Sequence, residues 1–425
     1  MQTFKYPAPD EWGPLTERAV SNQQAVIDKI RPVLEEVKQN KDQAVKAFTE
    51  RFDGVTLDRI AVSEEEIKNG CLKVNSQLKD AINTARLNIQ KFHENQKPSI
   101  RKIETTPGVV CWQKSVPIEK VGLYIPGGSA PLFSTVLMLA VPAAVAGCKE
   151  IVLCSPPGKD GKIHPAILLA AHLSGIKNIY KAGGAQAIAA MAYGTESIPK
   201  VDKIFGPGNS FVTAAKQLVS LEGTAIDLPA GPSEVLVMAD ESADPEFVAS
   251  DLLSQAEHGP DSQAILVTSS EELISQTEKE IEKQLASLPR AETTQKALQH
   301  SRLILLKDQK EMIAFSNAYA PEHLILAVRD YHTVAEEIKH AGSVFLGNYT
   351  PESAGDYASG TNHTLPTYGY ARAYSGVGLD SFCKKITFQE ISQKGLKKLG
   401  SVIETMAAAE QLDAHKMAVS LRLKK

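Results

Sequence analysis

A glutamine and a histidine near the middle of the chain, Gln255 and His258, form the first pair with metal-binding chemistry. Asp244 can cap a helix that has Pro245 in its first position, and Gly259 is placed to end that helix. The pair then lies one turn apart on one face of the last helical turn, at the end whose dipole favours a cation. Residues of these types at this spacing are also common as ordinary polar groups, so the pair alone leaves both interpretations open.

A second candidate is the acid–base pair Glu322 and His323, which follows Pro321 and comes directly before the apolar run LILAV. Side chains at the junction of a loop and a sheet strand are held still by the strand, which suits catalysis. The adjacent carboxylate and imidazole would offer two separate proton acceptors. The alternative is a polar loop end without chemistry.

Two acids and a histidine further along the chain extend these possibilities. Asp356, in an irregular stretch, is either a turn former or a carboxylate that completes a mixed nitrogen and oxygen site for zinc. Glu410 and His415, on the predicted last helix, are about 140° apart around an ideal helix and do not share a face. Either that helix kinks or restarts near Asp413, or the two side chains contact different parts of one ligand.

Three glycine turns, each between a predicted strand and a predicted helix, are candidates for a nucleotide site. They are Pro126-Gly127-Gly128, Gly183-Gly184 and Gly206-Pro207-Gly208-Asn209. Such turns present backbone N–H groups and a helix N-terminus to phosphates. None of them is the GxGxxG fingerprint, so the prediction of nucleotide binding from the turns alone is weak.

The elements that position these residues alternate between short apolar runs and helical patterns. In the first series the apolar runs are 121–125, 150–154, 178–182 and 201–205. In the second series they lie within EVLVMA, AILVT, RLILL, HLILAV and GSVFLG. Apolar runs of this length between helices are typical of βαβ units, so the sequence predicts an α/β protein with two parallel sheets.

Three other regions complete this organisation. The first hundred residues have helical patterns, and Ser63 with Glu66 forms a capping box. The stretch 347–380 has neither the apolar periodicity of a helix nor that of a strand. An irregular stretch of this length inside a compact protein is usually a functional loop. The chain is predicted to end in a helix opened by a second capping box, Ser401 with Glu404.

Composition and charge exclude several classes of protein. The chain has 425 residues, of which 43% are hydrophobic and 23% charged, as in a folded globular protein with two or more domains. A net charge of −4 gives no basic footprint for nucleic acid or an anionic membrane. The N-terminus has no signal-peptide pattern, and no apolar run reaches the ~20 residues of a membrane span.

The five cysteines are scattered and include no CxxC pair, which favours a reducing compartment. We therefore expect a cytoplasmic protein without a nucleic-acid or membrane partner. Cys148 and Cys154 could be thiol nucleophiles, as in aldehyde-oxidising enzymes. Their apolar surroundings beside predicted strands favour buried, inert thiols instead.

Eight segments, taken together and in order, resemble the histidinol dehydrogenase family. They are GLYIPGGSAPLFSTVLMLAVPA, GGAQAIAA, KIFGPGN, LPAGPSEVLV, SDLLSQAEHGPDSQ, APEHLI, SVFLGNYTPESAGDYASGTNHTLPTYG and the final AAAEQLDAHK. The resemblance runs from roughly residue 20 to the end of the chain and implies two Rossmann-like parallel-sheet domains, a helical N-terminal region and a small C-terminal helical segment. The implied division is an N-terminal segment (1–21), a larger discontinuous α/β domain (22–125 with 233–377), an NAD-binding α/β domain (126–232) and a C-terminal helical segment (378–425).

The resemblance also implies a reaction and the residues that carry it. The family oxidises L-histidinol through L-histidinal to L-histidine, the last steps of histidine biosynthesis, with two NAD⁺ and one zinc ion per subunit. The matching zinc ligands are Gln255, His258, Asp356 and His415, the base for the alcohol proton is His323, and the group that activates water is Glu322. The matching NAD contacts are Tyr124, Gln186 and Asn209, and the substrate contacts are Ser233, Gln255, His258, His323, Asp356, Glu410 and His415. The family is a homodimer whose C-terminal segment reaches into the partner's site, which Glu410 and His415 would complete.

Three alternatives stay open at the level of sequence. A related zinc- and NAD-dependent alcohol dehydrogenase would act on another polyol or on a hydroxy-sulfonate, with the same zinc and NAD residues. A zinc hydrolase would use Glu322 to activate water, and the glycine turns would then be packing features. A metabolite sensor would bind without catalysis, which the intact pair of Glu322 and His323 disfavours.

Overall fold

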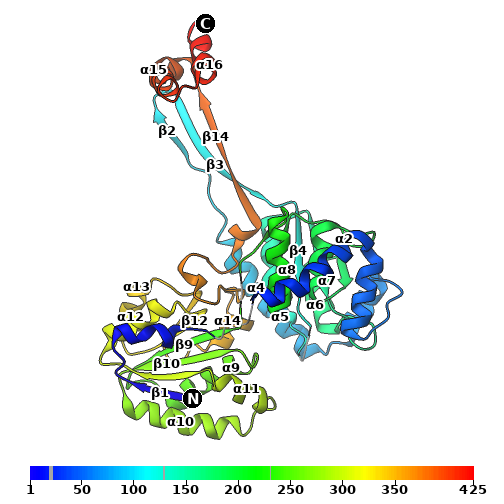
Figure 1. The fold of residues 1–425 in the computed structure, drawn as a ribbon, viewed down its shortest axis with the longest axis vertical. Coiled ribbons are helices and arrows are strands. Elements are labelled where there is room, and N and C mark those ends of the chain that lie inside the picture. Colours follow the sequence, from blue (N-terminus) through cyan, green and yellow to red (C-terminus); the bar gives the residue numbers. More distant parts are fainter. Residues whose placement is uncertain (19–22, 128–129, 230) are drawn as a thin grey trace.

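The computed structural model describes residues 1–18, 23–127, 130–229 and 231–425. Figure 1 shows two α/β units and an arm of strands and helices that projects away from them. In the described part of the chain these elements form a six-stranded parallel sheet, a five-stranded parallel sheet and a three-stranded antiparallel sheet. The two parallel sheets, the helical N-terminal region and the C-terminal helices confirm the predicted fold class.

The five-stranded sheet is the core of the smaller unit. Its strands are β4 (Lys120–Tyr124), β5 (Glu150–Ser155), β6 (Asn178–Lys181), β7 (Lys203–Phe205) and β8 (Ala225–Ile226), and the intervening helices are α5 (Phe133–Ala146), α6 (Pro165–Leu173), α7 (Gly184–Tyr193) and α8 (Ser210–Leu221). The order β6-β5-β4-β7-β8, with every pair parallel, is the order 3-2-1-4-5 of a doubly wound fold. Apolar side chains are buried on both faces of the sheet, which explains the nearly continuous apolar runs in the sequence.

Three helices from the first hundred residues pack on the helices that flank this smaller sheet. The helix α2 (Gln23–Asp53), interrupted at Lys41, packs on α7 and α8, while α3 (Glu64–Lys73) packs on α6 and α4 (Ser76–Glu94) packs on α5. As predicted, Ser63 caps α3, since its side chain accepts a hydrogen bond from the Glu66 N–H. The packing of α2 on α7 and α8 brings its C-terminal end beside the loop that follows β5, where Lys159 donates to the backbone carbonyl of Asp53.

The six-stranded sheet of the larger unit repeats the same order. Its strands are β9 (Glu234–Ala239), β10 (Gln263–Thr268), β11 (Arg302–Leu305), β12 (His323–Ala327) and β13 (Ser343–Leu346), with helices α9 (Pro245–Ala256), α10 (Glu271–Leu285), α11 (Ala291–Leu298), α12 (Gln309–Tyr319) and α13 (Tyr331–Glu337). The order β11-β10-β9-β12-β13 is again 3-2-1-4-5. A further parallel strand that was not predicted, β1 (Gln2–Lys5), pairs with β11, and it is followed by a 3-10 helix (Pro9–Glu11) and by α1 (Trp12–Thr16).

The stretch 347–380 is more regular than the sequence predicts. It contains the short helix α14 (Glu352–Tyr357) and a 3-10 helix (Tyr370–Arg372), and a second 3-10 helix (Leu379–Phe382) follows at its end. The prediction of an irregular stretch is therefore wrong for α14. A helix of six residues is too short to show a clear apolar periodicity.

The arm consists of an antiparallel sheet and two helices. These elements are β2 (Lys102–Thr106), β3 (Val109–Pro117), β14 (Cys383–Ile391), α15 (Gln393–Ala409) and α16 (Asp413–Leu423). The sequence analysis missed this sheet because β2 and β14 are exposed along nearly their whole length and show no apolar alternation. The capping box predicted at Ser401 is also wrong. Ser392 caps α15 by accepting from the Gly395 N–H at 3.1 Å, and Ser401 lies inside the helix.

No helix among the described residues is long and apolar enough to cross a bilayer. Strand pairing groups β1 with the larger sheet and β4 with the smaller one. The division of the chain into domains at residues 21, 125, 232 and 377 stays a prediction.

Candidate functional site

The candidate acid–base pair lies at the amino ends of two adjacent strands of the larger sheet. His323 is the first residue of β12, and Glu234 is the first residue of its neighbour β9. The Glu234 N–H donates to Glu322 Oε2 at 2.9 Å, and His323 Nδ1 lies 3.2 Å from the Glu234 carbonyl oxygen. Because a carbonyl only accepts, Nδ1 carries a proton in this contact, and in the neutral imidazole Nε2 is then the acceptor. The backbone of one residue thus orients both buried side chains.

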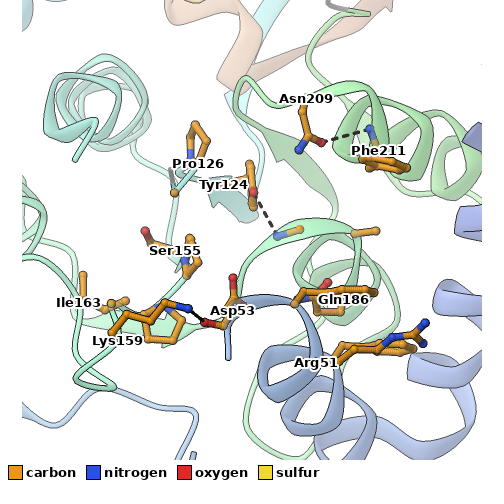
Figure 2. Close-up of a pocket in the computed structure, with 18 of the residues that line it drawn as sticks. Arg51, Asp53, Tyr124, Pro126, Ser155, Lys159, Ile163, Gln186, Asn209 and Phe211 are labelled. Carbon is orange, nitrogen blue, oxygen red and sulfur yellow. Dashed lines mark hydrogen bonds between the residues drawn. The ribbon is translucent and has the colours of Figure 1, made fainter. Parts of the chain in front are cut away.

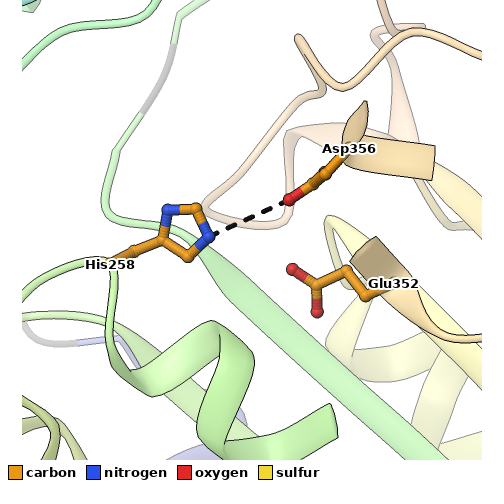
Figure 3. Close-up of side chains that lie close together, drawn as sticks. All are labelled: His258, Glu352 and Asp356. Carbon is orange, nitrogen blue, oxygen red and sulfur yellow. Dashed lines mark ion pairs between the residues drawn. The ribbon is translucent and has the colours of Figure 1, made fainter. Parts of the chain in front are cut away.

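Three side chains with metal-ligand atoms lie beside this pair: His258, Glu352 and Asp356 (Figure 3). Their ligand atoms are all within 4.8 Å of one another, and His258 Nε2 is 3.9 Å from Asp356 Oδ2. His258 comes from the loop after α9, whereas Glu352 and Asp356 both come from α14. The structure therefore brings two of the predicted ligands together with an acid that the sequence analysis missed.

Glu352 is buried at 1% exposure, which sets it apart from an ordinary surface acid. The sequence carried a signal for it, because Glu352 and Asp356 are four residues apart and so share one face of a helix. The small residues in ESAGDY favoured a turn instead, and that interpretation concealed the spacing.

Gln255 is the innermost polar side chain of the group, with 0% exposure in the last turn of α9. Its amide lies between the Glu352 carboxylate and the Glu234 N–H. With the amide nitrogen toward Glu352, Gln255 donates to Oε2 at 3.0 Å and accepts from the Glu234 N–H at 3.1 Å. With the amide oxygen toward Glu352, three acceptor oxygens face one another, which a bound cation makes favourable.

The end of α9 differs from the prediction. Asp244 caps the helix and Pro245 is its first residue, as expected, but the helix ends at Ala256. His258 consequently lies beyond the helix rather than on its last turn, with a side chain that is 45% exposed. A half-exposed imidazole in a loop can turn toward a ligand more freely than one on a packed helix.

More acidic than basic groups surround His323. Its Nδ1 is 3.6 Å from Glu322 Oε2 and 3.8 Å from Glu352 Oε1, and its Nε2 is 3.6 Å from Asp356 Oδ1. Burial lowers the pKa of His323, but the carboxylates of Glu352 and Glu322 outweigh burial and hold that pKa well above its ordinary value. Burial also raises the pKa of Glu352 well above its usual range. Such an excess of buried carboxylate fits a site that holds a divalent cation.

The N-terminal segment anchors the residue that orients the pair. Arg18 donates from Nε and Nη2 to the Glu234 carboxylate at 3.1 and 2.7 Å, and its guanidinium lies 3.7 Å from the centre of the Tyr319 ring. Burial raises the pKa of Glu234 in spite of the charge of Arg18. This bidentate pair fixes the start of β9, and with it the backbone groups that hold Glu322 and His323. The sequence analysis assigned no role to Arg18.

A cavity of ≈ 630 Å³ opens beside the acid–base pair. Residues of both units line it, among them Gly206, Asn209, Ser233, His258, Glu322 and His363. The predicted substrate contact Ser233 is therefore in its wall. His363 links the two units, because its Nδ1 is 2.9 Å from the Asp356 carbonyl oxygen and its Nε2 is 3.3 Å from Thr135 Oγ1 on α5.

The predicted NAD contacts line a larger cavity of ≈ 1390 Å³ at the carboxyl ends of the strands in the smaller sheet (Figure 2). Tyr124 ends β4, and its hydroxyl accepts from the Gly184 N–H at 3.1 Å. Gln186 is in the first turn of α7, and Asn209 caps α8. The structure thus brings Tyr124, Gln186 and Asn209 into one cavity, beside the point between β4 and β7 where doubly wound folds bind nucleotides.

The glycine turns allow a close approach of backbone segments at this cavity. Gly206 has φ of +132°, and a Cβ atom there would lie 2.1 Å from the Tyr124 carbonyl oxygen. Gly184, also at positive φ, begins α7 and directs its N–H to Tyr124. Gly127 lines the cavity, whereas Gly128 of the first predicted turn lies outside the described residues. Burial raises the pKa of Tyr124 to about 12, so its hydroxyl keeps its proton at neutral pH.

The cysteines contribute to packing, as predicted. Burial raises the pKa of Cys148 to about 12, and it also raises the pKa of the fully buried Cys154. Neither thiol is in the wall of the two cavities described above.

Glu410 and His415 lie on the arm, away from the other candidate ligands (Figure 1). The helix α15 ends at Ala409 and α16 starts at Asp413, so the structure has the restart near Asp413, one of the two possibilities that the sequence left open. Both side chains are exposed. Within one chain the structure therefore gathers Gln255, His258 and Asp356 but not His415.

Comparisons with known proteins agree on one family. Residues 16–423 match the family model described as histidinol dehydrogenase. The chain is 60% identical over 423 residues to histidinol dehydrogenase of Bacteroides thetaiotaomicron, covering 100% of this chain and 99% of that protein. It is 54% identical over 411 residues to that of Escherichia coli K12, covering 96% and 94%. The crystal structure of histidinol dehydrogenase from Elizabethkingia anophelis matches with a TM-score of 0.98 and 57% identity, covering 100% of this chain and 98% of that one.

Proposed function

We propose that this chain, which belongs to the histidinol dehydrogenase family, oxidises L-histidinol through L-histidinal to L-histidine with two NAD⁺. The family consists of NAD-dependent oxidoreductases. Because the chain belongs to this family, it takes part in histidine biosynthesis. We further propose that it works in the cytoplasm and takes no nucleic acid or membrane as partner.

One observation carries this proposal: Glu322 of the buried acid–base pair and His258 of the metal-competent group line the same cavity as Asn209, which also lines the cofactor cavity. A hydride donor and its acceptor must come into contact. The shared wall gives the nicotinamide a route to the substrate cavity beside Glu322 and His323. A zinc hydrolase would need the acid–base pair and the metal-competent group, but it would have no use for the cofactor cavity.

His323 supplies the base for the two oxidations. Because its Nδ1 is held by the Glu234 carbonyl, the neutral imidazole presents Nε2 to accept the proton of the substrate hydroxyl while a hydride passes to the nicotinamide. A bound cation would favour this neutral form, because it would offset the carboxylates that raise the pKa of His323. The products of the first step are the aldehyde, NADH and a proton on the imidazole. The imidazolium returns this proton to the aldehyde oxygen as water adds to the carbonyl carbon, which frees Nε2. The aldehyde hydrate then transfers a second hydride to a second NAD⁺, and its hydroxyl proton goes to the freed Nε2.

Glu322 supplies the water chemistry between the two oxidations. One of its carboxylate oxygens accepts from the Glu234 N–H, and the side chain lines the cavity. That hydrogen bond fixes the carboxylate, so it can take a proton from a water molecule as the water oxygen adds to the aldehyde carbon. The adduct is the hydrate that the second oxidation requires.

The residues that would hold zinc are Gln255, His258 and Asp356, with His415 from a second copy of the chain. The buried carboxylate of Glu352, which lies beside Asp356 and His258, fits a divalent cation. When bound, the ion supplies a positive centre that orients the imidazole and amine of the substrate. Ser233 and Glu410 would complete the contacts with the substrate, Glu410 by facing its cationic amine.

We propose a homodimer in which the arm of each subunit completes the site of the other. The exposed position of Glu410 and His415 supports this, as does the apolar surface of the arm. Large apolar side chains exposed on it include Ile386, Val402, Met406, Leu412, Met417 and Leu421. An apolar surface of this kind on a projecting element is typical of an interface.

Mixing two inactive variants tests the exchange. His323→Asn removes the base from the body and His415→Asn removes the ligand from the arm, so a mixed dimer has one site with both residues intact. Refolding the two variants together should restore about a quarter of the wild-type specific activity, because half of the dimers are mixed and each has one intact site. Activity no higher than that of either variant alone would contradict the exchange.

The reaction itself is tested by the amount of NADH formed from a limiting amount of L-histidinol. Two NADH per histidinol are expected. One NADH would remove the role assigned to Glu322, and no NADH would contradict the proposed function.

A further inference from the structure

The two ends of the cofactor cavity can be assigned to the two halves of a dinucleotide. Asn209 lines both this cavity and the substrate cavity, so the nicotinamide half of a dinucleotide must lie near Asn209 to exchange hydride with a substrate. The adenosine half then extends to the opposite end. Figure 2 shows Arg51, Asp53 and Lys159 on the side of the cavity away from Asn209.

The strand that usually recognises the adenosine ribose carries no acid here. In doubly wound folds, an acid after the second strand of the 3-2-1-4-5 order accepts hydrogen bonds from the ribose hydroxyls. The second strand of the smaller sheet is β5, which ends at Ser155 and is followed by Pro156 and Pro157. The next acid, Asp160, is exposed and accepts from the Lys162 N–H within its own turn.

Asp53 brings a carboxylate to this place from another element. It is the last residue of α2, and Lys159 Nζ donates to its backbone carbonyl at 2.7 Å, which ties the loop after β5 to the helix. Figure 2 shows the Asp53 side chain directed between Ser155 and Gln186, at the carboxyl ends of β5 and β6.

The Asp53 carboxylate has a buried oxygen that finds no donor in the described part of the chain. The residue is half-buried, and no described residue donates to its Oδ2. The neighbouring ammonium of Lys159 bonds to the backbone carbonyl of Asp53 instead. Burial raises the pKa of Asp53, as is usual for a carboxylate with a buried oxygen that has no donor. Two vicinal hydroxyls are donors of suitable number and spacing for such a group.

We propose that Asp53 accepts hydrogen bonds from the adenosine ribose diol and is the residue that makes the enzyme prefer NAD over NADP. The proposal rests on the proposed NAD-dependent function. A 2′-phosphate at the same place would bring negative charge against the carboxylate and remove one of the two donors. The cations Lys29, Arg51 and Lys159 also line the cavity and would attract phosphate, so the preference depends on Asp53 rather than on the overall charge.

The test compares Asp53→Asn and Asp53→Ser with the wild type, using kcat/KM for NAD and for NADP at saturating histidinol. We expect kcat/KM for NAD to fall about 10- to 100-fold, the range for losing hydrogen bonds to a charged acceptor, mainly through KM. The ratio of kcat/KM for NAD to kcat/KM for NADP should fall by at least the same factor. Glu36→Gln is the matched control, since Glu36 lines the same cavity on α2 and should leave the ratio unchanged.

Calorimetric titration with AMP and with adenosine 2′,5′-bisphosphate separates this proposal from the proposed function, because it needs no turnover. Wild-type protein should bind AMP more tightly, and Asp53→Asn should reverse or abolish that preference. An unchanged preference in correctly folded Asp53→Asn and Asp53→Ser overturns the role of Asp53 while NADH formation by the wild type still stands. Absence of NADH formation contradicts the proposed function, and the titration then still decides on Asp53.

Discussion

The two parallel sheets have the same strand order, but they use opposite edges. The smaller sheet forms the cofactor cavity at the carboxyl ends of β4, β5 and β7. The larger sheet places Glu322, His323 and the metal-competent group at the amino ends of β9 and β12. The usual rule for open α/β sheets, ligands at the carboxyl edge, therefore holds for one unit and not for the other.

Helix polarity gives a physical reason for this difference. In a βαβ unit the helices begin at the carboxyl edge of the sheet and end at the amino edge. The N-termini of α7 and α8 face the cofactor cavity and favour anions such as phosphates. The C-terminus of α9, with Gln255 in its last turn, faces the other site and favours a cation. One fold used at opposite edges thus provides an anion site and a cation site.

The largest effect that this comparison predicts is the loss of the base at the amino edge. His323→Asn should lower kcat about 10²- to 10⁴-fold, the usual contribution of a general base, while KM for NAD changes less than twofold. Steady-state kinetics with both substrates checks this. His332→Asn, on the exposed surface of α13, is the control and should behave as wild type. A large rise in KM for NAD would show that the two edges are not separate in function.

The next effect concerns the metal. His258→Asn should reduce zinc affinity by more than the ~10- to 100-fold that loss of an outer partner costs, and activity should fall with it. The fold should remain, because the side chain of His258 is half-exposed. Zinc content after dialysis, with the melting temperature as control for folding, measures this. Full zinc content in a folded variant would contradict the assignment of His258 as a ligand.

A smaller effect is expected at the carboxyl edge of the smaller sheet. Gly206→Ala should lower the free energy of unfolding by about 1–3 kcal/mol, since a Cβ atom would meet the Tyr124 carbonyl at a positive φ. Gly223→Ala is the matched control, because Gly223 also has a positive φ but has no atom within 4 Å of its added Cβ. Chemical denaturation of both variants isolates the clash from the backbone strain. An equal loss of unfolding free energy in the two variants would show that the close approach of Gly206 to Tyr124 does not contribute to stability.

The sequence predicted the parts of this arrangement that depend on local patterns. The central strands of both sheets are buried on both faces, so their apolar runs were visible, and the glycine turns marked the cofactor edge. The short edge strands β1 and β8 are more exposed and were not predicted. The angle between Glu410 and His415 indicated that one straight helix facing one ligand was unsuitable, and the restart between α15 and α16 was one of the two possibilities it left open. Each of these predictions needs only neighbours in the chain.

What the sequence did not predict depends on contacts between distant segments. The bidentate pair of Arg18 and Glu234 joins residues 216 positions apart, and no local pattern links one to the other. Glu352 became recognisable only when α14 brought it against His258 and Gln255. The antiparallel sheet of the arm joins β3 and β14, whose exposed strands have no core to impose a pattern. Burial leaves a pattern in the sequence, whereas long-range polar pairing does not.

The smallest effect separates two roles of Asn209. Its Oδ1 accepts from the Phe211 and Val212 N–H groups at 3.1 Å, which caps α8 at the cofactor edge. Asn209→Ala should cost about 1 kcal/mol of stability through the lost cap, whereas Asn209→Asp keeps the cap and should cost less. If the side-chain amide also contacts NAD, both variants should raise KM for NAD, because Asp removes the amide donor and adds a negative charge. A KM that rises in Asn209→Ala alone would mean that the capped helix end, and not the amide, is what the cofactor needs at this edge.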